Sequence, residues 1–64
     1  MSNEYKEQLR DILSFTNGRR LLTLKEVRAY TGFADNRTVK RRFIFQDGYI
    51  TAVQLAIQLS GGAQ

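Results

Sequence analysis

The sequence predicts one small, mainly α domain: four short helices with a central helix-turn-helix and a minimal β-hairpin. Three observations lead to this prediction. The chain has 64 residues, which is enough for one hydrophobic core and too few for two. Apolar residues recur at helical spacing in four segments that glycine-containing turns separate. Two of these segments are joined by only three to four residues, which is the spacing of a helix-turn-helix. We therefore expect a single domain over residues 1–64.

The first helix is predicted to begin near Ser2 or Asn3 and to stop at Gly18. Its apolar residues form one stripe, at positions i, i+4, i+7 and i+8, namely Tyr5, Leu9, Ile12 and Leu13. We expect this stripe to pack in the core, and a dimer face is the alternative.

The second helix carries a complete start signal. Thr23 is placed as the N-cap and Glu26 as the third helical residue, which together make a capping box. Leu22 before the cap and Val27 after it can pack together as a hydrophobic staple. The helix should run to about Thr31 and end at Gly32.

The third helix follows an Asp35 cap and has two different faces. Val39 and Phe43 fall on one side, whereas Arg37 and Arg41 fall directly opposite. Thr38 lies beside the two arginines, and Lys40 and Arg42 lie on the flanks. Residues 36–43 contain no Asp or Glu, so these cations repel one another unless an anion binds. An apolar face that anchors the helix and a cationic face that projects from it are typical of a DNA recognition helix; a surface helix kept soluble by its charges is the alternative.

A short hairpin and a fourth helix complete the chain. Phe43–Phe45 and Tyr49–Ile50 flank Gln46-Asp47-Gly48, which predicts a hairpin that serves as a truncated wing or only as a connector. Thr51 and Gln54 then repeat the capping signature. The last helix is apolar around more than half of its circumference and ends at Ser60-Gly61-Gly62. It should close the core against the first helix, the alternative being contact with a second copy of the chain.

The net charge of +4 is concentrated in the middle of the chain. Residues 17–45 hold eight basic and two acidic residues, a balance of +6, whereas residues 1–16 and 46–64 each carry −1. Lys and Arg contacts to phosphate supply most of the non-specific affinity for nucleic acid. This distribution favours a polyanion-binding surface over residues 17–45.

The missing residue types exclude several classes of function. Without His or Cys, the chain lacks the common zinc ligands and the common neutral-pH base. No nucleophile lies near a base, so we expect neither an enzyme nor a metal, a cofactor or a small-molecule substrate. A charged N-terminus without an apolar stretch argues against a signal peptide or a membrane span. We expect a cytoplasmic protein.

Residues 22–43 resemble the N-terminal half of the excisionase and MerR-type winged-helix families, and the resemblance extends from Leu22 to about Leu59. These families share an L-T-x-x-E-V/A helix, a glycine, an R-T-V/L recognition helix, a short wing and a closing helix. The positions that match are Thr23, Glu26, Val27, Gly32, Arg37, Thr38 and Val39. Two features differ: the turn between Gly32 and Thr38 is one residue longer, and Arg28 stands where the families have a small residue. The resemblance implies a winged-helix-like fold and double-stranded DNA as the partner. It also suggests an origin in a phage or mobile element.

The predicted function is therefore DNA binding by a small architectural or regulatory factor, excisionase-like or a transcriptional regulator. Base edges are assigned to Arg37, Thr38 and Arg41, with Asn36 at the start of the same helix. Phosphates are assigned to Lys40, Arg42, Arg19, Arg20, Lys25 and Arg28, the last of these by the resemblance. A homodimer or a cooperative oligomer on DNA is expected, because one such module rarely binds tightly alone. The alternatives are a protein-interaction module whose basic face meets an acidic partner, and RNA binding through Tyr30, Phe43, Phe45 and Tyr49.

Overall fold

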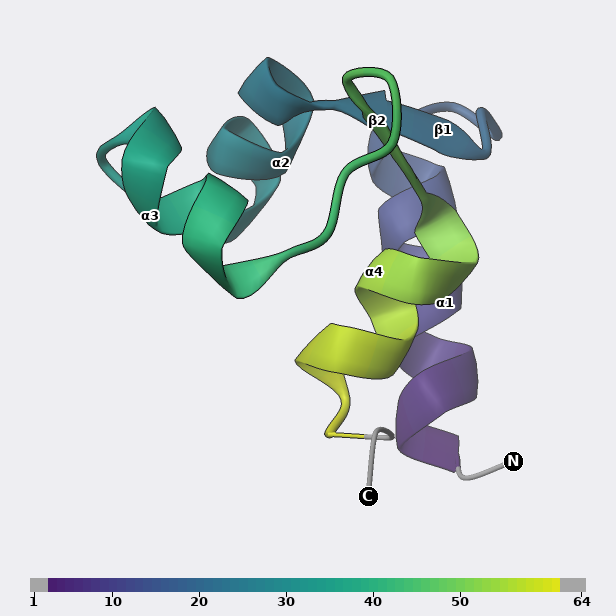
Figure 1. The fold of residues 1–64 in the computed structure, drawn as a ribbon. Helices are drawn as coiled ribbons and strands as arrows, with labels where there is room; N and C mark the ends of the chain where they lie inside the picture. Colours follow the sequence, from purple (N-terminus) through teal and green to yellow (C-terminus); the bar gives the residue numbers. More distant parts are fainter. Residues whose placement is uncertain (1–2, 62–64) are drawn as a thin grey trace.

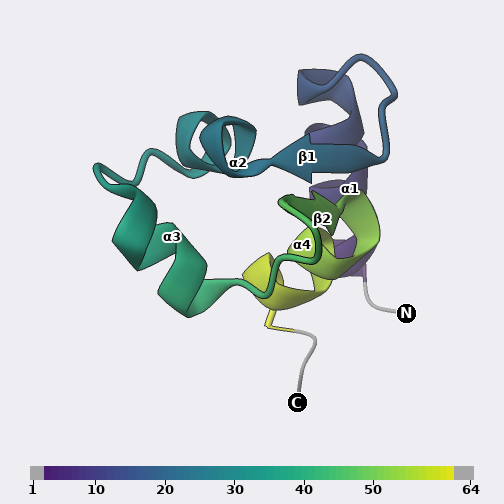
Figure 2. The same ribbon diagram turned by 45° about the horizontal axis from the view of Figure 1, so that its top comes forward.

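Helices and short strands make up the fold in the computed structural model, which describes residues 3–61 (Figure 1). The elements are α1 (Asn3–Phe15), β1 (Leu21–Thr23), α2 (Leu24–Thr31), α3 (Asn36–Arg42), β2 (Tyr49–Thr51) and α4 (Ala52–Leu59). Helices α1 and α4 lie side by side, and α2 and α3 extend away from them on the other side of the strands (Figures 1 and 2). The mainly helical, winged-helix-like fold predicted from the sequence is confirmed.

Helix α1 ends three residues before the predicted stop. Asn17 and Gly18 both adopt left-handed backbone angles, with φ of 58° and 90°. The Gly18 N–H donates to the carbonyl of Leu13 at 2.7 Å, which is the closing bond of a Schellman motif. Thr16 is buried and its hydroxyl donates to the Arg19 carbonyl at 2.7 Å, so the turn is held from within. The predicted start at Ser2 lies outside the described residues.

The strand pairing differs from the prediction. Residues 43–45 form no strand; β2 instead pairs antiparallel with β1, with Leu22 opposite Ile50. Of the predicted hairpin, only the tight turn remains, where Gln46 and Tyr49 exchange backbone hydrogen bonds of 2.8 and 3.0 Å. The reason lies in Phe43, which is buried in the core at the end of α3 and therefore cannot extend alongside residues 49–51.

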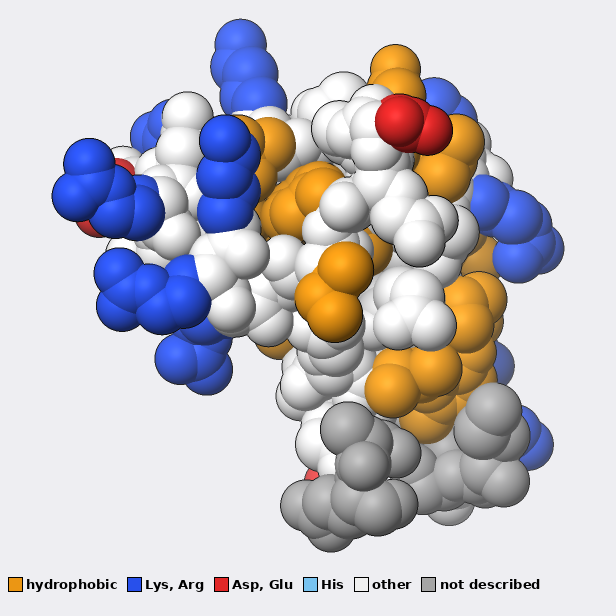
Figure 3. Space-filling model, viewed as in Figure 1, with side chains coloured by type: hydrophobic (Ala, Val, Ile, Leu, Met, Phe, Trp, Pro, Cys, Tyr) orange, Lys and Arg blue, Asp and Glu red, His pale blue; other side chains and the backbone are white. Residues whose placement is uncertain are grey.

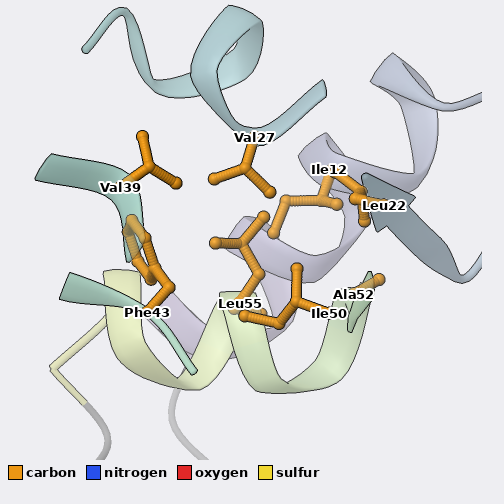
Figure 4. Packing of buried hydrophobic residues seen from close by; sticks show 9 residues of the cluster. Ile12, Leu22, Val27, Val39, Phe43, Ile50, Ala52 and Leu55 are labelled. Carbon is orange, nitrogen blue, oxygen red and sulfur yellow. The ribbon is translucent and has the colours of Figure 1, made fainter. Parts of the chain in front are cut away.

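Every element except the turns contributes to one hydrophobic core (Figure 4). The fully buried side chains include Ile12 of α1, Leu22 of β1, Val27 of α2 and Leu55 of α4. Three further α1 residues, Tyr5, Leu9 and Leu13, pack around them. The predicted apolar stripe of α1 is therefore core packing, and α4 closes the core against α1 as expected. No helix within residues 3–61 combines the length and the apolar character needed to cross a membrane.

Candidate nucleic-acid interface

The helix-turn-helix is built by side-chain caps at both helix starts. The Thr23 hydroxyl accepts from the Glu26 N–H at 3.2 Å, and Glu26 Oε1 accepts from the Thr23 N–H at 2.9 Å. This is the predicted capping box. Helix α2 ends at Gly32, whose φ of 84° is left-handed, and α3 begins at Asp35, whose carboxylate accepts from the Thr38 N–H at 2.9 Å. Four residues, 32–35, thus join the two helices.

Helix α3 has the two faces that the sequence predicts. Val39 and Phe43 are buried and point toward the side chains of Val27 and Leu55 (Figure 4). The opposite face is exposed, and we call its cations, Arg37, Lys40 and Arg41, the α3 basic face. Lys and Arg side chains gather over α3 at the edge of the molecule (Figure 3). Thr38 is half-buried beside them.

The cations of the α3 basic face have no close carboxylate. Within residues 3–61, the pair Arg19–Glu26 is the one place where a Lys or Arg nitrogen lies within 4.0 Å of an acidic oxygen. Asp35, at the start of α3, accepts hydrogen bonds from backbone N–H groups, chiefly that of Thr38, and these hold its pKa below the ordinary value. The charge of Arg41 makes a smaller contribution to this lowered pKa, so Asp35 offsets part of the positive charge of the basic face. Three cations against this one carboxylate still leave a net positive charge that an external anion can neutralise.

Arg42 is held against an aromatic ring. Its guanidinium carbon lies 5.4 Å from the centroid of the Phe33 ring, a cation–π contact. Phe33 in turn packs against Phe43, with ring centroids 6.4 Å apart. The sequence assigns Arg42 to phosphate; in the structure it braces the end of α3 against the turn. Sequence reasoning missed the role of Phe33, although an aromatic residue in a tight turn next to a basic helix was a usable signal.

Arg28 and Asn36 bind each other instead of facing outward independently. Arg28 Nη1 donates to Asn36 Oδ1 at 3.1 Å, which links α2 to the first residue of α3. Arg28 Nε is buried and has no hydrogen-bond partner among the described residues. The long side chain thus reaches from α2 to the start of α3 and positions that helix.

Arg19 is engaged by Glu26. The two side chains form an ion pair, in which Arg19 Nη2 donates to Glu26 Oε2. The hydrogen bond from Arg19, followed by that from the Thr23 N–H, lowers the pKa of Glu26 to about 2. Glu26 therefore both caps α2 and ties the turn after α1 to the start of the helix-turn-helix.

Lys25 and Arg20, the last two residues predicted to contact phosphates, lie on different parts of the surface. Lys25 is exposed on the first turn of α2 and lines a shallow hollow with Arg28, Ala29 and Phe33. Arg20 is exposed and directly precedes β1, at the end of the strand that is not joined to α2. The start of β1 lies away from α3 in both ribbon views (Figures 1 and 2). Its carbonyl accepts from the Ala52 N–H at 2.8 Å. Lys25 can therefore join a contact made by α3, whereas Arg20 lies on a separate part of the surface.

A polar cluster that sequence reasoning missed joins α1 to α2. Gln8 donates to the Tyr30 hydroxyl at 2.6 Å, and that hydroxyl donates to Asp11 at 2.5 Å. The Tyr30 ring also packs edge-on against Phe15, 5.2 Å between centroids. Desolvation, then the bond to Asp11, raises the pKa of Tyr30 to about 12. The cluster holds α2 on the body of the protein.

Comparisons with protein-family models, with curated proteins and with solved structures returned no match. Residues 3–61 contain no group of three or more acidic, His or Cys side chains arranged to hold a metal ion.

Proposed function

We propose that the protein binds double-stranded DNA through helix α3. One observation carries this proposal: α3 is anchored by Val39 and Phe43, and its opposite face presents the three exposed cations of the α3 basic face, with no acid in residues 36–43. The cations of such a surface repel one another and attract an anion. A row of phosphates supplies that anion, and phosphate contacts provide most of the affinity of DNA-binding domains.

The dimensions of α3 suit the major groove. An α-helix with its side chains is about 10–12 Å across, and the major groove is about 12 Å wide. The seven residues of α3 make about two helical turns that can lie in it. Arg37 and Arg41, one helical turn apart, are the side chains suited to the O6 and N7 atoms of guanine. Lys40 and Lys25 are suited to phosphates on either side. The resemblance to excisionase and MerR-type domains supports the same orientation of the helix.

Duplex DNA fits the surface better than RNA does. Of the aromatic residues considered for stacking on RNA bases, Phe43 is buried and Tyr30 is engaged by Gln8 and Asp11. Single-stranded RNA recognition needs exposed aromatic faces next to the cations. Tyr49 is exposed, but it lies on β2 and not on α3.

In this proposal the protein is a regulatory or architectural factor of a phage or mobile element and acts in the cytoplasm. We assign it no catalytic role. Its contact surface is a single short helix with few free cations, so we expect two or more copies to bind neighbouring sites on the DNA.

The test is fluorescence anisotropy of a labelled mixed-sequence duplex titrated with the protein at several salt concentrations. A mixed-sequence duplex offers no selected guanine site, so the three cations of the α3 basic face and Lys25 can all contact phosphates. About four phosphate neutralisations predict that log affinity falls with log salt at a slope of about −4. Single-stranded RNA of equal length is titrated in parallel. Failure to bind duplex at low salt, or equal binding to RNA, would refute the proposal.

Three variants separate the roles. Arg41→Ala should cost about 1–3 kcal/mol on a selected site and relax sequence preference, whereas Lys40→Ala should weaken all duplexes alike. Arg10→Ala removes the same charge from an exposed position on α1 and should change affinity little. If all three variants lose the same affinity on every duplex, net charge explains the binding and α3 has no special role.

A further inference from the structure

A hollow that shares only Arg41 with the proposed DNA contact lies between the ends of α3 and α4. These two helix ends lie close together in both ribbon views (Figures 1 and 2). The apolar side chains that line the hollow are Phe33, Phe43, Ile44 and Leu59. Gln58 of α4 and two arginines of α3 complete the lining. The hollow is therefore an apolar surface bordered on one side by positive charge.

Ile44 makes this surface unusual for a protein that stands alone. Its side chain is 76% exposed, the highest value among the exposed large hydrophobic residues of the described chain. A single exposed apolar residue needs no explanation, but one that continues into an apolar hollow marks an interaction surface. A partner that covers Ile44 therefore gains affinity from the burial of its side chain.

The charges of the hollow restrict what can fill it. Arg41 and Arg42 stand at its edge, and no acidic residue lines it. The Arg42 guanidinium lies over the Phe33 ring, and because the residue is exposed, a carboxylate can accept from its N–H groups. The occupant must therefore combine apolar side chains with negative charge.

We propose that this hollow is the docking site for an acidic amphipathic segment of a partner protein. Apolar side chains of the segment cover Ile44, Phe33 and Leu59, while its carboxylates pair with Arg41 and Arg42. Duplex DNA fits the hollow poorly, because its base faces are stacked on one another and the apolar group that its base edges present is the thymine methyl, inside the major groove. Arg41 also belongs to the α3 basic face, so the segment and DNA exclude each other; this last consequence alone rests on the proposed function.

The probe is a short labelled peptide with Leu and Phe on one helical face and Glu on the other. Two control peptides replace Glu by Lys, or Leu and Phe by Ala. Fluorescence anisotropy without DNA should show binding of the probe, with each control weaker by about tenfold or more, the equivalent of 1.4 kcal/mol. No binding of the probe, or equal binding of the acidic alanine peptide, would overturn the proposal.

Variants locate the site. Ile44→Ser should lower the affinity for the probe by about tenfold. Val53→Ser removes an exposed apolar residue of α4 outside the hollow and should leave this affinity unchanged. Gln58→Lys adds a cation to the edge and should tighten the probe by about twofold to fivefold, a gain that misfolding cannot produce. Unchanged affinity in both Ile44→Ser and Gln58→Lys would place the peptide elsewhere and refute the site.

A competition experiment tests exclusion separately. Unlabelled probe peptide added to a complex of the protein with labelled duplex should release the DNA, and Ile44→Ser protein should need about tenfold more peptide. If the protein binds the probe but no DNA, the docking site stands and the DNA proposal fails. If it binds DNA but not the probe, the reverse holds.

Discussion

Replacing Glu26 by Gln tests how the ion pair with Arg19 stabilises the start of the helix-turn-helix. The glutamine amide oxygen can still accept from the Thr23 N–H, so the capping hydrogen bond is retained while the charge is lost. An exposed ion pair contributes about 0.2–1 kcal/mol, and the weaker acceptor adds a few tenths. We expect the free energy of unfolding to fall by about 1 kcal/mol at neutral pH.

The pH dependence identifies the cause. The pKa of Glu26 is lowered from 4.5 to about 2 in the folded protein, chiefly by Arg19. The folded state therefore binds the Glu26 proton less readily than the unfolded state does. The stabilisation is present above pH 4.5 and is lost as pH falls toward 2. Because the glutamine side chain of the variant does not titrate, the stability difference between wild type and variant should shrink over this same interval.

The assay is urea unfolding followed by circular dichroism at several pH values across that interval and at neutral pH. Glu7→Gln, at an exposed position on α1, is the matched control for the loss of one carboxylate. A difference between wild type and Glu26→Gln that stays constant as the pH falls would refute the reasoning. A loss equally large in Glu7→Gln would show that net charge, and not the ion pair, is responsible.

Three further predictions concern the attachment of α3 and α2. Val39→Ala removes two methyl groups from a fully buried site and should lower the unfolding free energy by about 2 kcal/mol in urea denaturation; an unchanged midpoint would show that α3 is not anchored there. Tyr30→Phe keeps the ring contact with Phe15 but loses both hydroxyl bonds, and should cost about 1–2 kcal/mol. The raised pKa of Tyr30 means that this stabilisation is present below pH 10 and disappears as pH rises toward 12, so an absorbance titration should show one tyrosine ionising near pH 12 that is missing from the variant. Asp35→Ala removes the cap that accepts from the Thr38 N–H and should increase amide hydrogen exchange in the first turn of α3 while leaving α1 unchanged; uniform exchange throughout the protein would contradict this.

Local signals in the sequence were sufficient to predict where α2 and α3 begin and where α2 ends. The Thr23 and Glu26 capping box, the left-handed Gly32 and the Asp35 cap are all found where the residue types place them. Each of these features involves residues within four positions of one another, so their physics is contained in the local sequence. The burial of Val39 likewise follows from helical periodicity alone.

The strand partner could not be predicted in the same way. Asp47-Gly48 does form a tight turn, with φ of 53° and 83°, and this made a hairpin with the preceding residues the natural expectation. Pairing of residues 43–45 with residues 49–51 would remove Phe43 from the core, where its side chain is buried at the end of α3. This tertiary contact prevents the hairpin. Residues 49–51 then find their partner in β1, which is far away in the sequence. Nothing local distinguishes β1 from other short apolar segments.

Tertiary contacts also decide which Lys and Arg side chains are held by other residues and which stay free to contact DNA. This changes the interface that the sequence alone predicts. Arg19, Arg28 and Arg42 meet Glu26, Asn36 and Phe33 respectively, each of which is at least seven positions away in sequence. Charge counting alone assigns all of them to phosphates. In the structure, Arg28 and Arg42 brace the two ends of α3, so that its position is set before any anion arrives. The free cations are then fewer than the sequence suggests, and the salt dependence of DNA binding should be correspondingly shallow. A slope of about −7 in log affinity against log salt would require Arg19, Arg28 and Arg42 to leave their partners when DNA binds. The bracing contacts would then belong only to the unbound protein.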